Sequence, residues 1–166
     1  QGAAEDPTSV PQRQLLLTQT EGLVSRFQAL SDRLDSVLRN INQSIEADIA
    51  SINSLAQGLA ETNAAIALAS SSGAAGQQPN QLLDERDETL RQLSKYISIS
   101  AVENGTDGSV DVYFGKGEPL VLGNVTTELR AVPNPVDGNF LDFAMVVNGR
   151  GQNVTSKLDG GSIGGH

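Results

Sequence analysis

The sequence has 166 residues, no cysteine and a formal net charge of −9. The lack of cysteine excludes disulfide frameworks, thiol nucleophiles and thiolate metal sites. With 20 acidic against 11 basic residues and no basic cluster, the chain is expected to bind neither nucleic acid nor an anionic membrane surface, and it has no apolar run of transmembrane length.

A long helix is predicted over about residues 12–69. Large apolar residues recur from Leu23 at alternating steps of four and three, which is the seam of a helix that packs lengthwise against other helices. Two successive steps of four at Ile41, Ile45 and Ile49 indicate a stutter in this pattern, and Gly22 is a candidate break. The residues of this helical seam are Leu23, Phe27, Leu30, Leu34, Val37, Ile41, Ile45, Ile49, Ile52, Leu55, Leu59 and Ile66.

The core is expected to be aliphatic and thin, because the chain has four Phe, two Tyr and no Trp. A thin core spread along a helix of about 65 Å (about 1.5 Å per residue) leaves apolar surface without cover. That surface requires either another segment of a parent protein or a neighbouring subunit.

A second helix is predicted over about residues 80–95, after a Gly/Ser/Ala-rich connection long enough for it to fold back antiparallel on the first. Leu82, Leu83, Leu90 and Leu93 follow one face at helical spacing. Arg86 falls on the same apolar face. We therefore predict that its guanidinium binds a carboxylate or a helix-end carbonyl rather than solvent.

From Tyr96 onward the apolar period changes from 3.6 to 2, which predicts strands and hairpins. The sequence thus predicts an α+β fold: an elongated long-helix rod with a second antiparallel helix, followed by a small antiparallel β unit of hairpins. The expected domains are a helical region over 1–95, a β unit over 96–160 and a glycine-rich exit over 161–166, where backbones approach closely. The expected strands are 97–102, 110–114, 119–122, 129–132, 140–147 and 152–155.

No constellation of residues predicts catalysis, a cofactor or a small-molecule substrate. The only histidine is His166, at the end of the chain, and it cannot by itself form a triad or a metal site. Asp84 and Asp87 would be the ligands of a metal-dependent hydrolase. They share their helix with Arg86, Arg91 and Lys95, among other charges, which favours a solvated charged face instead.

Three segments, in order, carry a resemblance to a known family. The string Leu82-Leu83-Asp84-Glu85-Arg86-Asp87, then Leu90 and Leu93-Ser94, is similar to the LLDxRDxxLxxLS element of the bacterial flagellar hook-associated protein 1 family. It follows a loop that ends in Pro-Asn, here Gly76 to Asn80. It precedes a closing Leu-x-Gly-Gly-Ser-[IL]-Gly-Gly motif, here Leu158 to Gly165. The resemblance covers roughly residues 8–165.

This resemblance implies a structural subunit of the flagellum, exported from the cell, that forms the junction between hook and filament and self-assembles into a ring through helical packing. The implied partners are further copies, the hook protein and the second junction protein. Since the chain starts at Gln1 and lacks the family's terminal regions, we expect a central fragment, with His166 left from a tag. The expected packing residues are Leu23, Phe27, Leu30, Leu34, Ile41, Ile52, Leu59, Leu83, Arg86 and Leu90.

Two other interpretations stay open. A flagellin-like filament subunit shares the order of two helices followed by strands, although the Leu-Leu-Asp-x-Arg-Asp string favours the junction protein. A coiled-coil adaptor would instead use the seam as a groove for one partner helix.

Overall fold

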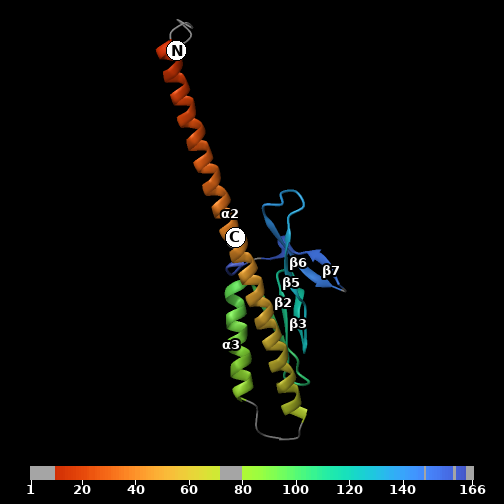
Figure 1. The fold of residues 1–166 in the computed structure, drawn as a ribbon. Coiled ribbons are helices and arrows are strands. Elements are labelled where there is room, and N and C mark those ends of the chain that lie inside the picture. Colours follow the sequence, from red (N-terminus) through yellow and green to blue (C-terminus); the bar gives the residue numbers. More distant parts are fainter. Residues whose placement is uncertain (1–9, 72–79, 148, 159, 164–166) are drawn as a thin grey trace. The chain divides into compact units, whose positions relative to one another are not determined.

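The computed structural model describes residues 10–71, 80–147, 149–158 and 160–163. Its contacts divide the chain between Asn40 and Ile41 into two units. In the described residues, the first unit is the N-terminal part of helix α2 (Val10–Ser71). The second contains the remainder of α2, helix α3 (Asn80–Tyr96) and strands β1 to β7 (Figure 1). The predicted α+β class, with a long helix, a second helix and then antiparallel strands, is confirmed.

Helix α2 continues through both of its interior glycines, so the candidate break at Gly22 is wrong. A glycine inside a helix costs only about 1 kcal/mol relative to alanine, and the flanking residues supply enough helix formers to absorb that cost.

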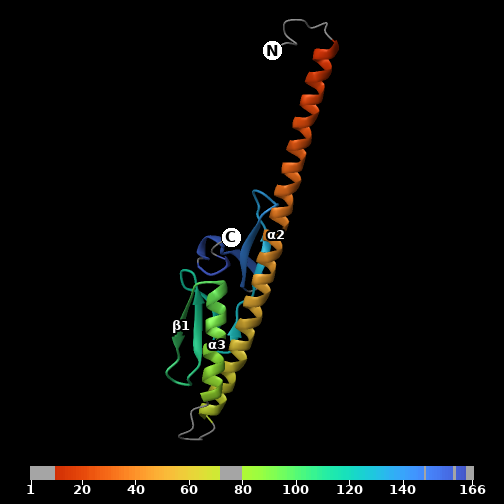
Figure 2. The same cartoon turned by 90° about the vertical axis from the view of Figure 1, so that its left-hand side faces the viewer.

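Helix α3 runs antiparallel beside the C-terminal part of α2, as both views show (Figures 1 and 2). Leu93 on α3 is fully buried, as is Ile97, which follows the helix. The connection over residues 72–79 lies outside the described residues.

The strands form two antiparallel meanders. One sheet has the order β1-β2-β3-β4 and the other β5-β6-β7; Ile99 pairs with Phe114 in the first and Leu129 with Met145 in the second. The strands are β1 (Ile99–Glu103), β2 (Val110–Phe114), β3 (Glu118–Leu122), β4 (Val125–Thr126), β5 (Leu129–Pro133), β6 (Leu141–Val147) and β7 (Arg150–Asn153).

The first and last strands differ most from their predicted bounds. Strands β3, β5 and β6 each differ by one residue, and β4 is a strand that the sequence does not predict. The N–H of Ile97 donates to the carbonyl of Leu93 (3.2 Å), so Ile97 is tied back to the last turn of α3, which ends at Tyr96, and β1 begins only at Ile99. The last strand ends at Asn153 rather than at Thr155. Thr155 instead begins a short 3-10 helix, η1 (Thr155–Lys157), and its hydroxyl accepts the N–H of Phe143 (2.8 Å).

One hydrophobic core joins the C-terminal half of the seam to the sheets. In β2 the buried residues alternate as period 2 requires, with Val110, Val112 and Phe114 facing inward. They pack with α2, α3 and the second sheet in a single cluster. Its fully buried large side chains include Ile52, Leu59, Leu93, Ile97, Leu120, Val121, Leu129 and Val154.

The segment after η1 docks against the C-terminal end of α3. The N–H of Ser162 donates to the carbonyl of Lys95 (2.9 Å), and the Ser162 hydroxyl donates to Asp48 Oδ2 on α2 (2.7 Å). Ile163 is buried. Gly161 has φ +63°, and a Cβ there would lie 2.3 Å from the carbonyl carbon of Tyr96, so only glycine permits this approach.

We therefore expect Gly161→Ala to lower the free energy of unfolding by more than about 2 kcal/mol, from steric overlap and left-handed strain together. Urea denaturation measures the effect. Gly138→Ala is the matched control, because nothing lies within 4 Å of its Cβ position. Equal stability of the two variants would contradict the docked arrangement.

Replacing Ile52, which is 0% exposed, by Asp is expected to cost several kcal/mol because an unpaired charge is buried. Ile41→Asp should cost less, since Ile41 is only partly buried against the core. Ser54→Asp, at an exposed neighbouring position, is the control. A melting temperature unchanged by the Ile52 substitution would refute burial of this part of the seam.

Candidate functional site: a polar clamp and an exposed helical seam

Asn63 joins α2 to the first sheet through a fully bonded carboxamide. Its Nδ2 donates to the carbonyls of Val110 (2.8 Å) and Gly123 (2.7 Å), and its Oδ1 accepts the N–H of Val110 (3.0 Å). The side chain is only 1% exposed. Because an amide offers one acceptor and two donors, it satisfies three backbone groups that the helix would otherwise leave without partners.

Asn53 repeats this arrangement with the second sheet. Its Nδ2 donates to the carbonyl of Leu129 (2.8 Å) and its Oδ1 accepts the N–H of the same residue (2.9 Å). Val110 and Leu129 are each the first residue of a strand, β2 and β5. One helix therefore fixes the start of a strand in each sheet through the same reciprocal pair of hydrogen bonds.

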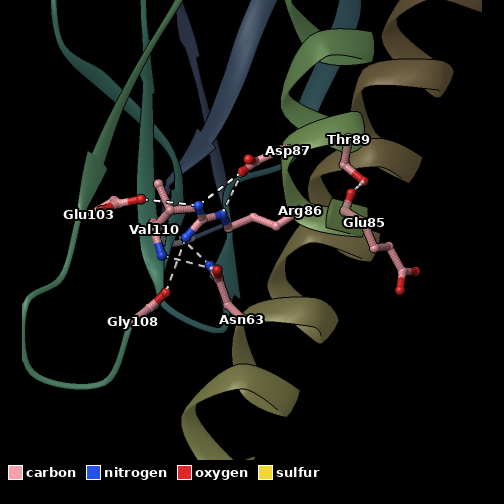
Figure 3. Close-up of polar contacts among 8 residues, drawn as sticks. All are labelled: Asn63, Glu85, Arg86, Asp87, Thr89, Glu103, Gly108 and Val110. Carbon is pink, nitrogen blue, oxygen red and sulfur yellow. Dashed lines mark hydrogen bonds and ion pairs between the residues drawn. The ribbon is translucent and has the colours of Figure 1, made fainter. Parts of the chain in front are cut away.

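Arg86 adds a third connection, from α3, and Figure 3 shows it reaching from the helix toward the β1–β2 hairpin. Its guanidinium donates to Glu103 Oε1 (3.0 Å), to Asp87 Oδ1 (3.0 Å) and to the carbonyl of Gly108 (3.4 Å). The prediction that Arg86 binds a carboxylate rather than solvent is therefore confirmed, because its guanidinium bonds to Glu103 and Asp87 and the residue is only 8% exposed. We call Asn53, Asn63 and Arg86 the polar clamp.

The loop that supplies the Gly108 carbonyl is itself held by hydrogen bonds. Asp107 Oδ1 accepts both the N–H (2.9 Å) and the hydroxyl (2.6 Å) of Ser109. The Ser109 hydroxyl, followed by its N–H, lowers the pKa of the Asp107 carboxyl below its usual value. Asn104 closes the loop, since its N–H donates to the carbonyl of Ser109 (2.7 Å).

The expected packing residues divide into two groups. Leu23, Phe27, Leu30 and Leu34 are exposed, Phe27 by 68%, and every residue from 13 to 37 is exposed. Ile52 and Leu59 are fully buried and Arg86 is buried, whereas Ile41, Leu83 and Leu90 are partly buried. We call residues 23–37 of this pattern the exposed seam. That these residues contact another subunit stays a prediction.

Two of the acidic residues of α3, Asp87 and Glu88, form local pairs. Glu88 bonds to Gln92 (3.0 Å) and Arg91 (2.8 Å), and these two partners lower the pKa of the Glu88 carboxyl. Asp87 bonds to Arg86. Among the described residues no group of three or more His, Asp or Glu side chains is placed to hold a metal ion. The helices of the described segments also contain no stretch with the length and hydropathy of a membrane span.

The sequence reasoning missed Asn53 and Asn63, although a signal was available. Asparagine is a poor helix former, and Asn63 lies four residues after Leu59 and three before Ile66, on the apolar face. A polar residue at such a position requires buried partners. The same reasoning succeeded for Arg86.

Comparisons with known proteins identify the same family, and each of them covers at least 98% of the chain. Residues 1–166 match the family described as "Flagellar hook-associated protein FlgK helical domain". The chain is 33% identical over 165 residues to the flagellar hook-associated protein 1 of Salmonella typhimurium and 32% identical over 166 residues to that of Escherichia coli K12. These alignments cover 98% of this chain and 29% of each relative.

A solved structure is similar as well. The flagellar hook junction protein FlgK from Burkholderia pseudomallei superposes with a TM-score of 0.87 at 28% identity, covering 99% of this chain and 29% of that protein. The chain thus spans less than a third of the length of these relatives.

Asn63→Ala should lower the free energy of unfolding by about 2–4 kcal/mol, because it leaves backbone groups of Val110 and Gly123 buried without partners. Chemical denaturation measures the loss. Gln57→Ala, also on α2 but exposed, serves as the control. A loss as small as that of the control would show that water replaces the carboxamide.

The Asp107 carboxylate should stabilise the fold in a pH-dependent way. Because its folded-state pKa is lowered, its contribution is fully present above the unfolded-state value of about 4 and is lost as the pH falls through the folded-state pKa. Asp107→Asn should therefore reduce stability at pH 6 and have a smaller effect in acid. The same difference at both pH values, measured by urea titration, would contradict this.

Proposed function

Because the chain belongs to the FlgK helical-domain family of flagellar hook-associated proteins, we propose that it is a structural part of the junction between the flagellar hook and filament. It acts by packing helices, and no residue is assigned a catalytic role. Its expected location is outside the cell, in the flagellum, after passage through the flagellar export apparatus. Its expected partners are further copies, the hook protein and the second junction protein.

The observation that carries this proposal is the exposed seam of α2. It has the heptad spacing of a helix-packing surface, yet Leu23, Phe27, Leu30 and Leu34 are all more than half exposed. Burying one such side chain is worth about 1.5–3 kcal/mol. Four or five such side chains on one helix therefore favour association with other helices, which belong either to the remainder of the parent polypeptide or to neighbouring copies.

Self-assembly into a ring follows if copies pack through surfaces that differ from each other, since such heterologous contacts close into rings or continue as helical filaments. The division of the chain into a helical region (1–95), a β unit (96–160) and an exit (161–166) stays a prediction.

An adaptor that binds one partner helix would use the same exposed seam, and it is the second candidate. It predicts a discrete complex with one partner. The flagellin-like interpretation has no observation of its own in its favour.

A chimera tests the junction role. The matching segment of the Salmonella typhimurium hook-associated protein 1 is replaced by this chain, in cells that lack their own copy. We expect filaments to remain attached to hooks, as counted by electron microscopy. Export of a stable chimera without any attached filament would contradict the junction role.

The exposed seam is tested in the same chimera with Phe27→Asp and Leu34→Asp together. Both positions are exposed in the isolated chain, so its melting temperature should not fall, whereas filament attachment should be lost. Gln28→Asp, exposed and off the seam, is the control. Normal filaments on the double variant would contradict packing through this surface.

A further inference from the structure

A small cavity lies beside α2, where the β1–β2 and β3–β4 hairpins meet the helix. Its volume is about 290 Å³, and it is lined by Asn63, Ala64, Ala67, Asp107, Ser109, Gly123 and Asn124. A second hollow of about 240 Å³ adjoins it and shares Ala64 and Asn124. We call the first cavity the Asp107 pocket.

The polar groups of the Asp107 pocket divide into satisfied and available ones. Asn63 is fully bonded, as described above, and forms part of the wall. Asp107 is held in place through Oδ1 alone, while its Oδ2 receives no hydrogen bond from another described residue. The side chain of Asn124 also makes no hydrogen bond within the described part of the chain. The pocket is thus lined by the carboxylate of Asp107, the amide of Asn124 and the apolar side chains of Ala64 and Ala67.

This combination suits one long cationic side chain. The volume is at the lower limit of cavities that hold small molecules, about 300 Å³, so a cofactor-sized ligand does not fit. An arginine can lay its aliphatic stem on Ala64 and Ala67 and point its planar donors at the two free acceptors. No lysine or arginine lines either hollow, so the position is electrostatically open to a cation.

The chain itself carries arginines on the exposed part of α2. Residues 10–40 contain four arginines and three carboxylates, whereas residues 41–166 contain seven basic and fifteen acidic residues. Arg26 and Arg33 directly precede seam residues Phe27 and Leu34, the position that flanks the interface of packed helices. Neither makes an ion pair with another described residue.

We propose that the Asp107 pocket receives Arg26 or Arg33 from the exposed seam of a second copy of this chain. This rests on the self-assembly proposed above and gives it a specific contact. Each copy offers one pocket and one arginine. The contact is heterologous when the pocket and the arginine of one copy bind two different neighbours, and it then propagates from copy to copy.

Sedimentation velocity on the whole chain over rising concentration tests the contact. Asp107→Asn should weaken self-association about tenfold, the size expected for losing one close charge pair, and added salt should weaken the wild type in the same direction. Ala64→Leu, which fills the pocket from an exposed position, should do likewise. Arg26→Gln or Arg33→Gln should reproduce the loss.

Two matched controls separate the contact from general charge effects. Asp137→Asn removes a carboxylate that likewise bonds through Oδ1 to a nearby N–H and side chain, in the β5–β6 loop, and should leave association unchanged. Arg39→Gln removes an arginine from the side of the helix opposite the seam and should also have no effect. Asp107→Arg combined with Arg26→Asp or Arg33→Asp in one chain should restore association that either single change weakens.

The outcomes are distinguishable. Wild-type self-association that Asp107→Asn and Ala64→Leu leave unchanged overturns the Asp107 pocket while leaving self-assembly in place. A wild-type chain that stays monomeric up to about 1 mM overturns the second copy as the occupant, and the junction role is then judged by filament attachment in the chimera. Loss in the pocket variants, with unchanged controls and rescue by the charge exchange, supports the proposal.

Discussion

Reciprocal hydrogen bonding between helix asparagines and strand backbones is the interaction on which this fold depends. A strand that packs on a helix presents backbone N–H and C=O groups that the helix, with its own groups already paired, cannot satisfy. Asn53 and Asn63 solve this problem twice, each giving a carboxamide to both backbone groups of a strand's first residue. Apolar contacts alone are non-directional; these bonds select one register of each sheet on α2, and Arg86 holds the adjoining hairpin.

One sequence pattern serves two purposes along α2. From Ile45 to Ile66 the seam residues are buried, apart from the partly buried Leu55, whereas from Leu23 to Val37 the same residue types are exposed. The stutter at Ile41, Ile45 and Ile49 falls where this change begins. The periodicity specifies that a face will be buried, but it does not specify by what. In the family to which the chain belongs, more than two thirds of the relatives' length lies outside the matched region.

Much of the fold could be predicted because its signals are local. Period 3.6 and then period 2 separate the two helices from the strands, and β2 has the predicted bounds. The carboxylate bound by Arg86 was predictable because a charge on an apolar face needs a partner. The errors concern features decided by tertiary contacts. Ile97 is predicted in a strand but directly follows α3 and bonds back to Leu93. Asn63 is overlooked because its partners, Val110 and Gly123, are 47 and 60 residues away. Gly22, read as a break, shows that a continuing helix tolerates one weak position.

The hydrogen bond from Ser162 to Lys95 places the end of the strand-rich segment at the point where that segment began. The segment from β1 to η1 therefore begins and ends at the C-terminal end of α3. Hairpin loops within this segment can lengthen or shorten without shifting the ends of the helices. Each doubling of loop length costs only about 0.6 kcal/mol in closure entropy. The geometry thus lets a change in loop length be absorbed at the tips of the hairpins while the ends of both helices stay in place.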